Sequence, residues 1–548
     1  MDAQILSRQA AELHRAGDVA GAERVYREAL AAAPDNFTAL HLLGVLCAQS
    51  GRKEEAETLM RAALKANSDS APALLNYGIL LEELGRHEEA LVAFERAAVL
   101  KPDFAAALYN LGNVQRALGR FDQAVGSYDR LLAIQPGHAE ALNNRGGALR
   151  SLGRFTQAMD SYDRALALLP GNAAIWRNRG NLLREHKCAL EAVASHDRAL
   201  ALEPHNADIW DDRGAALWEL RRVEEAIASF DRAIAADPGN VPAHFHKATC
   251  LLLLGRFGEG WRMLEWRRKL ASAAARNYPQ REWTGEEDIN GKTLLLWWEE
   301  GLGDTIMFFR YARLAVEKGA RVIVSVPDAM TRLVRDADAG VEIIGEAQTP
   351  PHFDFHAPFL SLPLAFATAF DAIPAPVPYL RAAPARVKSW AERIGSGGLR
   401  IGIVWATTTS RSLGRSFPLR QLEAVAKIPG VRLISLQKRD GIGELQHLPP
   451  GMRVEVFPFD QTGDAFVDSA AMMENLDLVI SADTAAAHLA GALGRPVWLA
   501  LQFAADWRWF LDPAGSPWYP TMRLFRQKAD GDWSGVFADI GAALAGKL

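Results

Sequence analysis

The first half of the chain repeats itself every 34 residues, and this period constrains the fold more than any other feature of the sequence. Prolines recur at that spacing, with Ser68 in the single gap. Glycines stand 24 residues before these prolines, alanines 12 before, and mostly large side chains eight before. The columns are Pro34, Pro102, Pro136, Pro170, Pro204 and Pro238; Gly44, Gly78, Gly112, Gly146, Gly180 and Gly214; Ala22, Ala56, Ala90, Ala124, Ala158, Ala192 and Ala226; and Tyr26, Met60, Phe94, Tyr128, Tyr162, His196 and Phe230.

These columns predict pairs of antiparallel helices. Small residues let the two helices approach closely, and the large side chain fills the space between them. A further glycine column supplies a left-handed turn between the helices, and the proline ends the second helix. The turn glycines are Gly17, Gly51, Gly85, Gly119, Gly153 and Gly255.

The pattern resembles the tetratricopeptide repeat (TPR). About seven repeats fit residues 3–240, and an incomplete eighth runs to about residue 270. We therefore expect residues 1–270 to form a right-handed TPR superhelix, an α-solenoid whose first helices line an inner groove.

A polar column lies two residues before the column glycine in five successive repeats. On an inner face, one amide per repeat suits the donors and acceptors of a peptide backbone, although such side chains can also merely solvate a helix. The TPR region of O-GlcNAc transferase has the same ladder, and these segments resemble it, which implies that the groove binds a protein acceptor. The predicted acceptor-binding residues are Asn76, Asn110, Asn144, Asn178 and Asp212.

After Leu270 the period ends, and residues 271–290 have the polar composition of a linker. Short β-rich runs then alternate with helical stretches, which predicts parallel sheets covered on both faces. We expect two Rossmann-like α/β lobes in the GT-B layout, at residues 291–395 and 396–548. The predicted strands are 292–298, 321–326, 341–345, 354–359, 400–406, 432–437, 453–457, 477–481 and 496–501.

Three segments of this second half carry residues suited to chemistry. In the first, LLLWWEEGLGDTIMF, Gly301 and Gly303 let backbone approach a ligand at the end of a strand, and Asp304 opens the next helix. A carboxylate there can accept the proton of an attacking hydroxyl, or serve only as a helix cap.

The second segment, SADTAAAHLAG, leads from a strand into a helix. The free N–H groups and positive dipole end of a helix N-terminus suit a diphosphate, with Asp483, Thr484 and His488 as donor ligands. The alternatives are a capping role for Asp483 and a partly buried His488 that faces the sheet.

The third segment is the Ser/Thr/Gly-rich loop WATTTSRSLGRSFPL. Arg411 and Arg415 in this loop form a local cationic site for phosphate oxygens, although two loop arginines alone are more often solvated charges. Gln437, at the end of the strand expected at 432–437, joins them in the predicted donor-binding set.

Together the three segments resemble the family-9, heptosyltransferase-like GT-B glycosyltransferases over residues 290–548. The resemblance implies that Gly303-Asp304 supplies the general base, that residues 415–418 bind donor phosphate, and that residues 483–488 bind the nucleotide-sugar. It also implies inversion at the anomeric carbon. Arg415 replaces the family's lysine and Ala485 its glycine, which leaves the identity of the donor open.

The tail DWRWFLDPAGSPWYPTMRLFRQ looks like the carboxyl end of TPR-linked bacterial members of this group. Its aromatic side chains offer stacking surfaces for a sugar or base, but we expect them to pack in the core. They are Trp507, Trp509, Trp518 and Tyr519.

The composition of the chain limits the kinds of partner and compartment that we expect for it. The net charge of −5 over 548 residues gives no bulk field for nucleic acid. Cys47, Cys188 and Cys250 lie far apart, as suits a reducing cytosol, and no stretch approaches the roughly 18 apolar residues of a membrane span. We expect a cytoplasmic protein without stable membrane insertion.

No metal or other cofactor is expected, because the helix dipole and the arginines neutralise the leaving diphosphate. Asp336-Ala-Asp338 forms a D-x-D, but it follows LVR at a predicted helix end and is interpreted as a solvated terminus.

The leading hypothesis is a protein O-glycosyltransferase that moves a sugar from a nucleotide-sugar to Ser or Thr of an acceptor in the TPR groove. Bacterial flagellin glycosyltransferases combine these two parts, so the resemblance implies flagellin as the acceptor. One alternative is transfer to a lipid-linked or polysaccharide acceptor; another is a scaffold with degenerate lobes. In the lipid alternative a junction cluster contacts the membrane, formed by Arg262, Arg267, Arg268, Lys269 and Arg276.

Overall fold

The computed structural model describes residues 2–270, 276–299, 301–337, 340–407, 414–461, 463–511 and 514–546. The chain divides into two compact units, Met1–Pro204 and His205–Leu548. The first unit is helical, and the second combines the last helical hairpins with two sheets rich in parallel strands. The predicted order, a helical solenoid followed by an α/β region, is confirmed.

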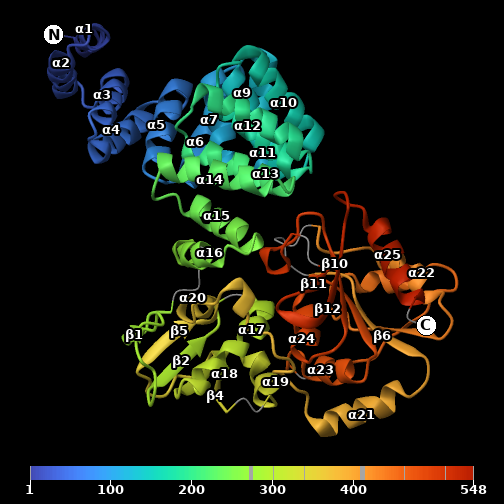
Figure 1. The fold of residues 1–548 in the computed structure, drawn as a ribbon. Helices are drawn as coiled ribbons and strands as arrows, with labels where there is room; N and C mark the ends of the chain where they lie inside the picture. Colours follow the sequence, from blue (N-terminus) through green and yellow to red (C-terminus); the bar gives the residue numbers. More distant parts are fainter. Residues whose placement is uncertain are drawn as a thin grey trace. The chain divides into compact units, whose positions relative to one another are not determined.

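The first unit consists of helical hairpins that follow the 34-residue period (Figure 1). Most first helices begin at a polar N-cap, as Asn36 shows by accepting a hydrogen bond from the Ala39 N–H at 3.0 Å. The helices are α1 Ala3–Arg15, α2 Val19–Ala32, α3 Phe37–Gln49, α4 Lys53–Ala66, α5 Ala71–Glu83, α6 His87–Leu100, α7 Ala105–Ala117, α8 Phe121–Ile134, α9 Ala139–Ser151, α10 Phe155–Leu168, α11 Ala173–Glu185 and α12 Ala189–Leu202.

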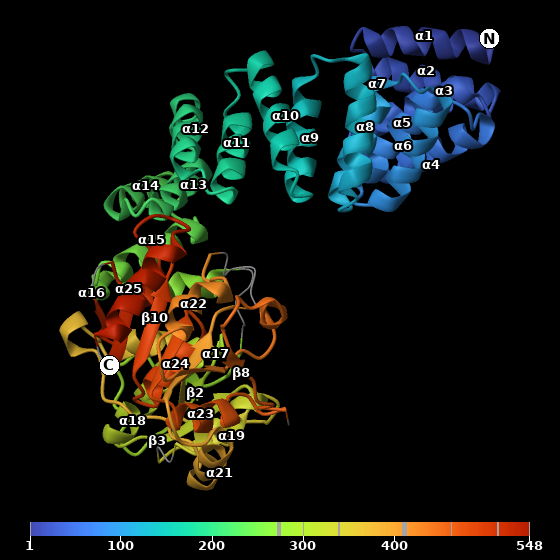
Figure 2. The same cartoon turned by 90° about the vertical axis from the view of Figure 1, so that its right-hand side faces the viewer.

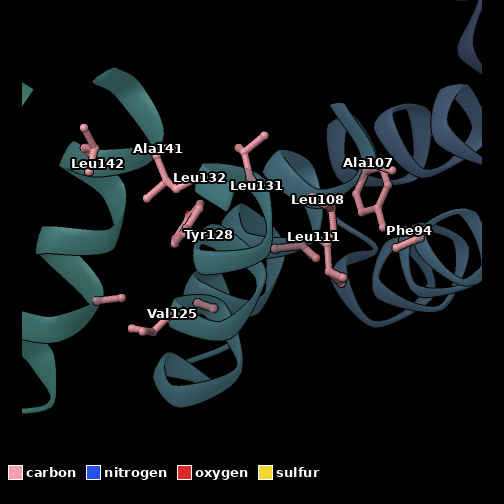
Figure 3. Packing of buried hydrophobic residues seen from close by; sticks show 14 of the residues in the cluster. Phe94, Ala107, Leu108, Leu111, Val125, Tyr128, Leu131, Leu132, Ala141 and Leu142 are labelled. Carbon is pink, nitrogen blue, oxygen red and sulfur yellow. The ribbon is translucent and has the colours of Figure 1, made fainter. Parts of the chain in front are cut away.

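From α3–α4 onward, each hairpin of this unit packs a large side chain against its column glycine. A Cβ atom added to Gly78 would lie 2.5 Å from Cε1 of Phe94, and one added to Gly112 would lie 2.5 Å from Cε1 of Tyr128. Both rings are fully buried, and Figure 3 shows them among the leucines and alanines of the hairpin cores. The structure therefore confirms the prediction that the small residues let the helices approach and that the large side chains fill the space between them.

The turn column also behaves as expected, with one substitution in this unit. Gly51, Gly85 and Gly119 have φ of +79°, +74° and +72°. Lys187 occupies the same column and takes φ +63°, a left-handed conformation that costs a residue with a Cβ about 1–2 kcal/mol. The turn of the repeat is therefore kept at this position, although a lysine disfavours the left-handed conformation.

The second unit begins with two more hairpins, which lead into a short 3₁₀ helix. Arg221 stands in the turn column with φ +58°, and its guanidinium donates to the Leu511 carbonyl oxygen at 3.0 Å. These elements are α13 Ala207–Glu219, α14 Val223–Ala236, α15 Val241–Leu253, α16 Phe257–Leu264 and η1 Glu265–Lys269.

The first sheet has the order β1-β5-β2-β3-β4, and every pair is parallel. Its edge strand β1 and the buried Trp283, which contacts Phe366, come from the segment expected to be a linker. The elements of this lobe are β1 Arg281–Glu282, β2 Thr293–Trp297, α17 Leu302–Phe308, α18 Arg310–Glu317, β3 Arg321–Val326, η2 Asp328–Met330, α19 Thr331–Arg335, β4 Glu342–Gly345, β5 Phe355–Pro358, η3 Phe359–Ser361, α20 Leu362–Ala365 and η4 Phe370–Ala372.

The second sheet has the order β11-β12-β10-β9-β6-β7-β8, parallel except for the pair β11–β12. From β8 to β12 this is the 3-2-1-4-5-6 order of a Rossmann fold. Strand β12 was not among the predicted strands, because the exposed Pro520 and Arg523 interrupt its apolar residues. The elements are α21 Pro384–Ile394, β6 Leu399–Val404, η6 Leu419–Leu422, α22 Glu423–Ala426, β7 Val431–Ser435, η7 Ile442–His447, β8 Val454–Glu455, α23 Val467–Glu474, β9 Leu478–Ala482, α24 Ala485–Ala492, β10 Val497–Leu501, η8 Trp507–Trp509, β11 Gly515–Ser516, β12 Tyr519–Arg526 and α25 Trp533–Ala545.

Aromatic side chains join the last hairpin to both lobes within this unit. The Trp261 indole N–H donates to the Thr368 carbonyl at 3.1 Å, and its ring lies 5.5 Å from that of Trp507. Trp509 and Trp518 are fully buried, as expected for the tail. The last hairpin is thus part of the core that supports η8.

The glycine–ring contact makes a stability prediction. Gly112→Ala should lower the stability of the solenoid by about 1–3 kcal/mol, because the new methyl group overlaps the Tyr128 ring. Gly126→Ala in α8 is the matched control: a Cβ there meets nothing within 4 Å, so a gain of about 0.5–1 kcal/mol is expected. Thermal unfolding followed by circular dichroism measures both, and equal shifts in the two variants would contradict the packing argument.

Candidate functional site

A cavity of about 750 Å³ lies where strands of the two lobes end. Loops after β2, β6, β7, β9 and β10 contribute to its wall. Parallel α/β sheets bind ligands at the carboxyl ends of their strands, at the point where strand order reverses, which in the second lobe is between β6 and β9. The predicted site residues Gly303, Asp304, Arg415, Gln437, Asp483, Thr484 and His488 all line this cavity.

The first lobe contributes the beginning of α17. Gly301, with φ +74°, precedes the helix, and Asp304 lies in its first turn. A Cβ on Gly303 would lie 3.1 Å from Cδ2 of His488, so the glycine lets the starts of α17 and α24 come together. The two helices lie side by side in both views (Figures 1 and 2).

The second lobe contributes the beginning of α24. Thr484 is the N-cap, and the small Ala485 and Ala486 in the first turn line the cavity. A helix N-terminus open to the cavity favours an anion. The methyl group of Ala485 lies in the cavity lining beside this N-terminus.

His488 is buried one turn further on. Its Nδ1 lies 3.0 Å from the Tyr519 hydroxyl, and its ring stacks on Trp509 at 5.1 Å. Burial, reinforced by the charge of Arg508, lowers the pKa of His488 to about 3. The imidazole is therefore neutral at physiological pH.

Charged side chains from both lobes form a continuous series across the cavity wall, which we call the Asp–Arg chain. Arg508 bridges the lobes, with Nη2 at 2.5 Å from Asp304 Oδ1 and Nη1 at 2.7 Å from Asp506 Oδ1. Arg415 continues the chain, with Nη2 at 3.2 Å from Asp506 Oδ2 and Nη1 at 3.5 Å from Asp483 Oδ2. Both arginines are thus held by carboxylates.

The three carboxylates differ in their pKa shifts. Burial raises the pKa of Asp304 and of Asp483, although Arg508 and Arg415 respectively oppose it. Burial also acts on Asp506, but the two guanidiniums outweigh it and lower its pKa to about 2. A raised pKa makes Asp304 the stronger proton acceptor, as a general base requires.

Gln437 supports the cavity wall. Its Oε1 accepts hydrogen bonds from the N–H groups of Trp405 at 3.0 Å and Ala406 at 3.1 Å, and its Nε2 donates to the Ala406 carbonyl at 3.0 Å. These bonds hold the loop after β6 in place. The structure thus shows a loop-positioning contact for a residue predicted to bind the donor.

Sequence reasoning missed several lining residues. Asp506 and Arg508 alternate with Trp507 and Trp509 in the DWRW segment, for which the sequence predicts only aromatic packing. Their place after β10 was the signal that could have found them. Lys438 and Arg439 follow β7 and add exposed cations, and an apolar wall consists of Leu436, Phe459, Phe466 and Met473.

Two residues singled out in the sequence lie outside the described ranges. They are Arg411, expected to bind phosphate, and Asp338 of the D-x-D pair. Within the described ranges, no group of three or more His, Cys, Asp or Glu side chains is arranged to hold a metal ion.

The amide ladder makes lateral hydrogen bonds within the first unit. Its side chains are half-buried, and three of the four asparagines bond a side chain of the preceding repeat. A carboxamide can make four hydrogen bonds, so capacity remains for a peptide. Asp212 belongs to the second unit. The bonds are Asn76 to His41 (2.9 Å), Asn110 to the Ala106 carbonyl (3.0 Å), Asn144 to Asn113 (3.0 Å) and Asn178 to Asn143 (2.9 Å).

The junction cluster is not a free basic surface. Arg267 is buried and pairs with Glu265 at 2.7 Å and Glu299 at 2.8 Å, and Arg268 pairs with Glu282 at 2.8 Å. Arg267 cannot contact a membrane, because it is buried and paired internally, whereas Arg268 is 40% exposed beside Glu282. Among the described helices, none is both long and apolar enough to cross a bilayer.

Comparison with known proteins identifies the repeats. Residues 13–76, 80–119, 109–173, 177–241 and 212–260 match models of the tetratricopeptide repeat. The helical hairpins are tetratricopeptide repeats. The chain is also 30% identical to Protein FlbA of Caulobacter vibrioides over 328 residues, which are 55% of this chain and 54% of that protein. It thus spans about half the length of the curated relative it matches.

Solved TPR structures match parts of the chain. A tetratricopeptide repeat protein from Parabacteroides merdae is 19% identical, with a TM-score of 0.36, over 45% of this chain and 98% of its own. A thermophilic TPR protein from Thermus thermophilus is 27% identical, with a TM-score of 0.29, over 33% of this chain and all of its own.

The buried histidine makes a pH prediction. Because the pKa of His488 falls from 6.5 to about 3 on folding, only the unfolded chain takes up its proton between these values, and stability is lost as pH falls below 6.5. The second unit should lose about 2 kcal/mol more between pH 7 and pH 5 than the variant His488→Gln. Denaturant unfolding at the two pH values measures this, with the exposed His205→Gln as a control that should follow the unsubstituted protein.

Proposed function

We propose that this protein is a glycosyltransferase that moves a sugar from a nucleotide-sugar to a Ser or Thr hydroxyl of a protein acceptor. One observation carries the proposal: Asp304 of the first lobe and Arg415, Asp483, Thr484 and His488 of the second line the same cavity. Groups suited to bind an anion and to accept a proton, gathered from two lobes, favour a ligand site over a degenerate scaffold.

The donor site needs an anion-binding end and an apolar end. Arg415 and the N-terminus of α24 supply the first, and they stabilise the negative charge of a diphosphate. Phe459, Phe466 and Met473 line the second and offer a surface for the nucleobase.

In the reaction, the Asp304 carboxylate takes the proton of the acceptor hydroxyl as its oxygen attacks the anomeric carbon. The bond from that carbon to the diphosphate breaks, and the nucleotide leaves with the electron pair. Arg415 and the dipole of α24 take up the developing charge, while neutral His488 adds no further charge to the site. Inversion at the anomeric carbon follows from the family resemblance.

The acceptor binds to the repeats. TPR solenoids present extended concave surfaces, and the amide ladder supplies backbone-binding groups along one of them. Flagellin is the specific acceptor that we propose from the family resemblance, and the cytoplasm is the proposed compartment.

The base assignment makes the first activity prediction. Asp304→Asn should lower the rate of sugar transfer at least ~100-fold while nucleotide binding persists, because the amide cannot take the proton. The test is transfer of radiolabelled sugar from a panel of nucleotide-sugars to purified flagellin. Asp336→Asn, at the end of α19 and outside the cavity, should retain full activity. Unchanged transfer by Asp304→Asn would remove this residue from the base role.

The amide ladder leads to a second prediction, on acceptor binding. The combined change of Asn110, Asn144 and Asn178 to Ala should weaken acceptor binding about 10-fold or more, since several hydrogen bonds to the peptide are lost, and leave donor affinity unchanged. Gln123→Ala with Gln157→Ala, on the second helices α8 and α10, is the control. Equal acceptor affinity in both variants, measured by titration calorimetry, would refute the ladder.

A further inference from the structure

The Asp–Arg chain has an excess of negative charge. It contains three carboxylates, from Asp304, Asp483 and Asp506, and two guanidiniums, from Arg415 and Arg508. These five groups together carry one negative charge. A diphosphate that enters the cavity meets the exposed Lys438 and Arg439 and two arginines already paired with carboxylates. To take the place at Arg508 Nη2, it has to displace the Asp304 carboxylate.

Arg508 is the arginine best placed for such an exchange. It lines the cavity, and its Nη2 holds the Asp304 carboxylate, while Nη1 and a ring contact with Trp507 at 4.3 Å anchor the guanidinium in the second lobe. Its Nε is buried without a hydrogen-bond partner among the described residues. The guanidinium can thus give up Asp304 and remain attached through Asp506.

The same contact blocks the base. An ion pair of 2.5 Å engages the Asp304 oxygen Oδ1, and the Arg508 charge opposes the rise in pKa that burial gives this carboxylate. While the pair persists, Asp304 is a weaker proton acceptor than its burial alone would make it.

We propose that Arg508 alternates between two anions, holding Asp304 before the donor binds and the donor's diphosphate afterwards. Donor binding then releases the general base, so the protein becomes competent for transfer only after the donor has bound. This inference rests on the proposed function, because it takes the cavity to be the site of the donor's diphosphate. Asp506 is a positioning residue in this scheme, since it holds both arginines at one carboxylate.

The test measures binding of inorganic pyrophosphate to the full chain by titration calorimetry. Asp304→Asn should tighten binding about 10-fold, because Arg508 no longer has to leave a carboxylate, and Arg508→Ala should weaken it about 10-fold. In the Arg508→Ala background, Asp304→Asn should lose most of its effect, because the competition it relieves is absent.

Asp483→Asn is the matched charge control. It removes the same charge from the same cavity but pairs with Arg415, so its effect on pyrophosphate affinity should persist in the Arg508→Ala background. If Asp304→Asn also keeps its full effect in that background, the exchange is refuted. Should Arg508→Ala fail to fold, Asp304→Asn alone decides, and unchanged or weaker binding overturns the proposal.

A further variant separates the exchange from the function on which it rests. If Arg415→Ala abolishes pyrophosphate binding while Asp304→Asn changes nothing, the donor site stands and the exchange fails. If the unsubstituted protein does not bind pyrophosphate, or Arg415→Ala binds it equally well, the proposed donor site fails as well.

Discussion

The close approach of two helix starts, α17 from the first lobe and α24 from the second, makes the rest of the site possible. Gly303 permits it, because any side chain there would press on the His488 ring. The approach places Asp304 within reach of Arg508, and so joins the charges of the two lobes. A cavity with anionic and cationic groups on its walls is the direct result.

Burial then sets the chemistry of these groups. In a low-dielectric cavity the neutral form of His488 is favoured, and each guanidinium needs a carboxylate partner. Paired charges in the wall of the cavity are a compromise between keeping the lobes together and leaving the arginines available. The structure resolves this compromise with one carboxylate, Asp506, which serves both arginines.

The repeats could be predicted in detail, because each column has a single packing role that does not depend on distant parts of the chain. The pair of Gly78 and Phe94 is an example, since both partners lie in one hairpin. The strands of the lobes were predictable for a similar reason: buried parallel strands are continuous apolar runs. Residues 519–526 were not predicted as a strand, because the exposed Pro520 and Arg523 interrupt the apolar run.

The site was only half predictable. Asp483 stands directly after a strand and Asp304 in the first turn of the helix that follows one, where a sequence pattern points to a ligand. Asp506 and Arg508 lie at the start of η8, which reaches the cavity through the order of strands in the second sheet. Gln437 lies at the expected wall, but its hydrogen bonds to Trp405 and Ala406 depend on the path of a neighbouring loop. Such contacts arise from tertiary structure and leave no local pattern.

The boundary between the compact units falls after Pro204, well before the 34-residue period ends. Arg221 and Trp261, although they belong to repeats, hold the segment that carries Asp506 and Arg508. Evolution can therefore lengthen, shorten or replace the array ahead of this boundary without disturbing the cavity, while the final hairpins must change together with it. The place at which a hybrid protein is best spliced is set by these two anchors rather than by the end of the repeat pattern.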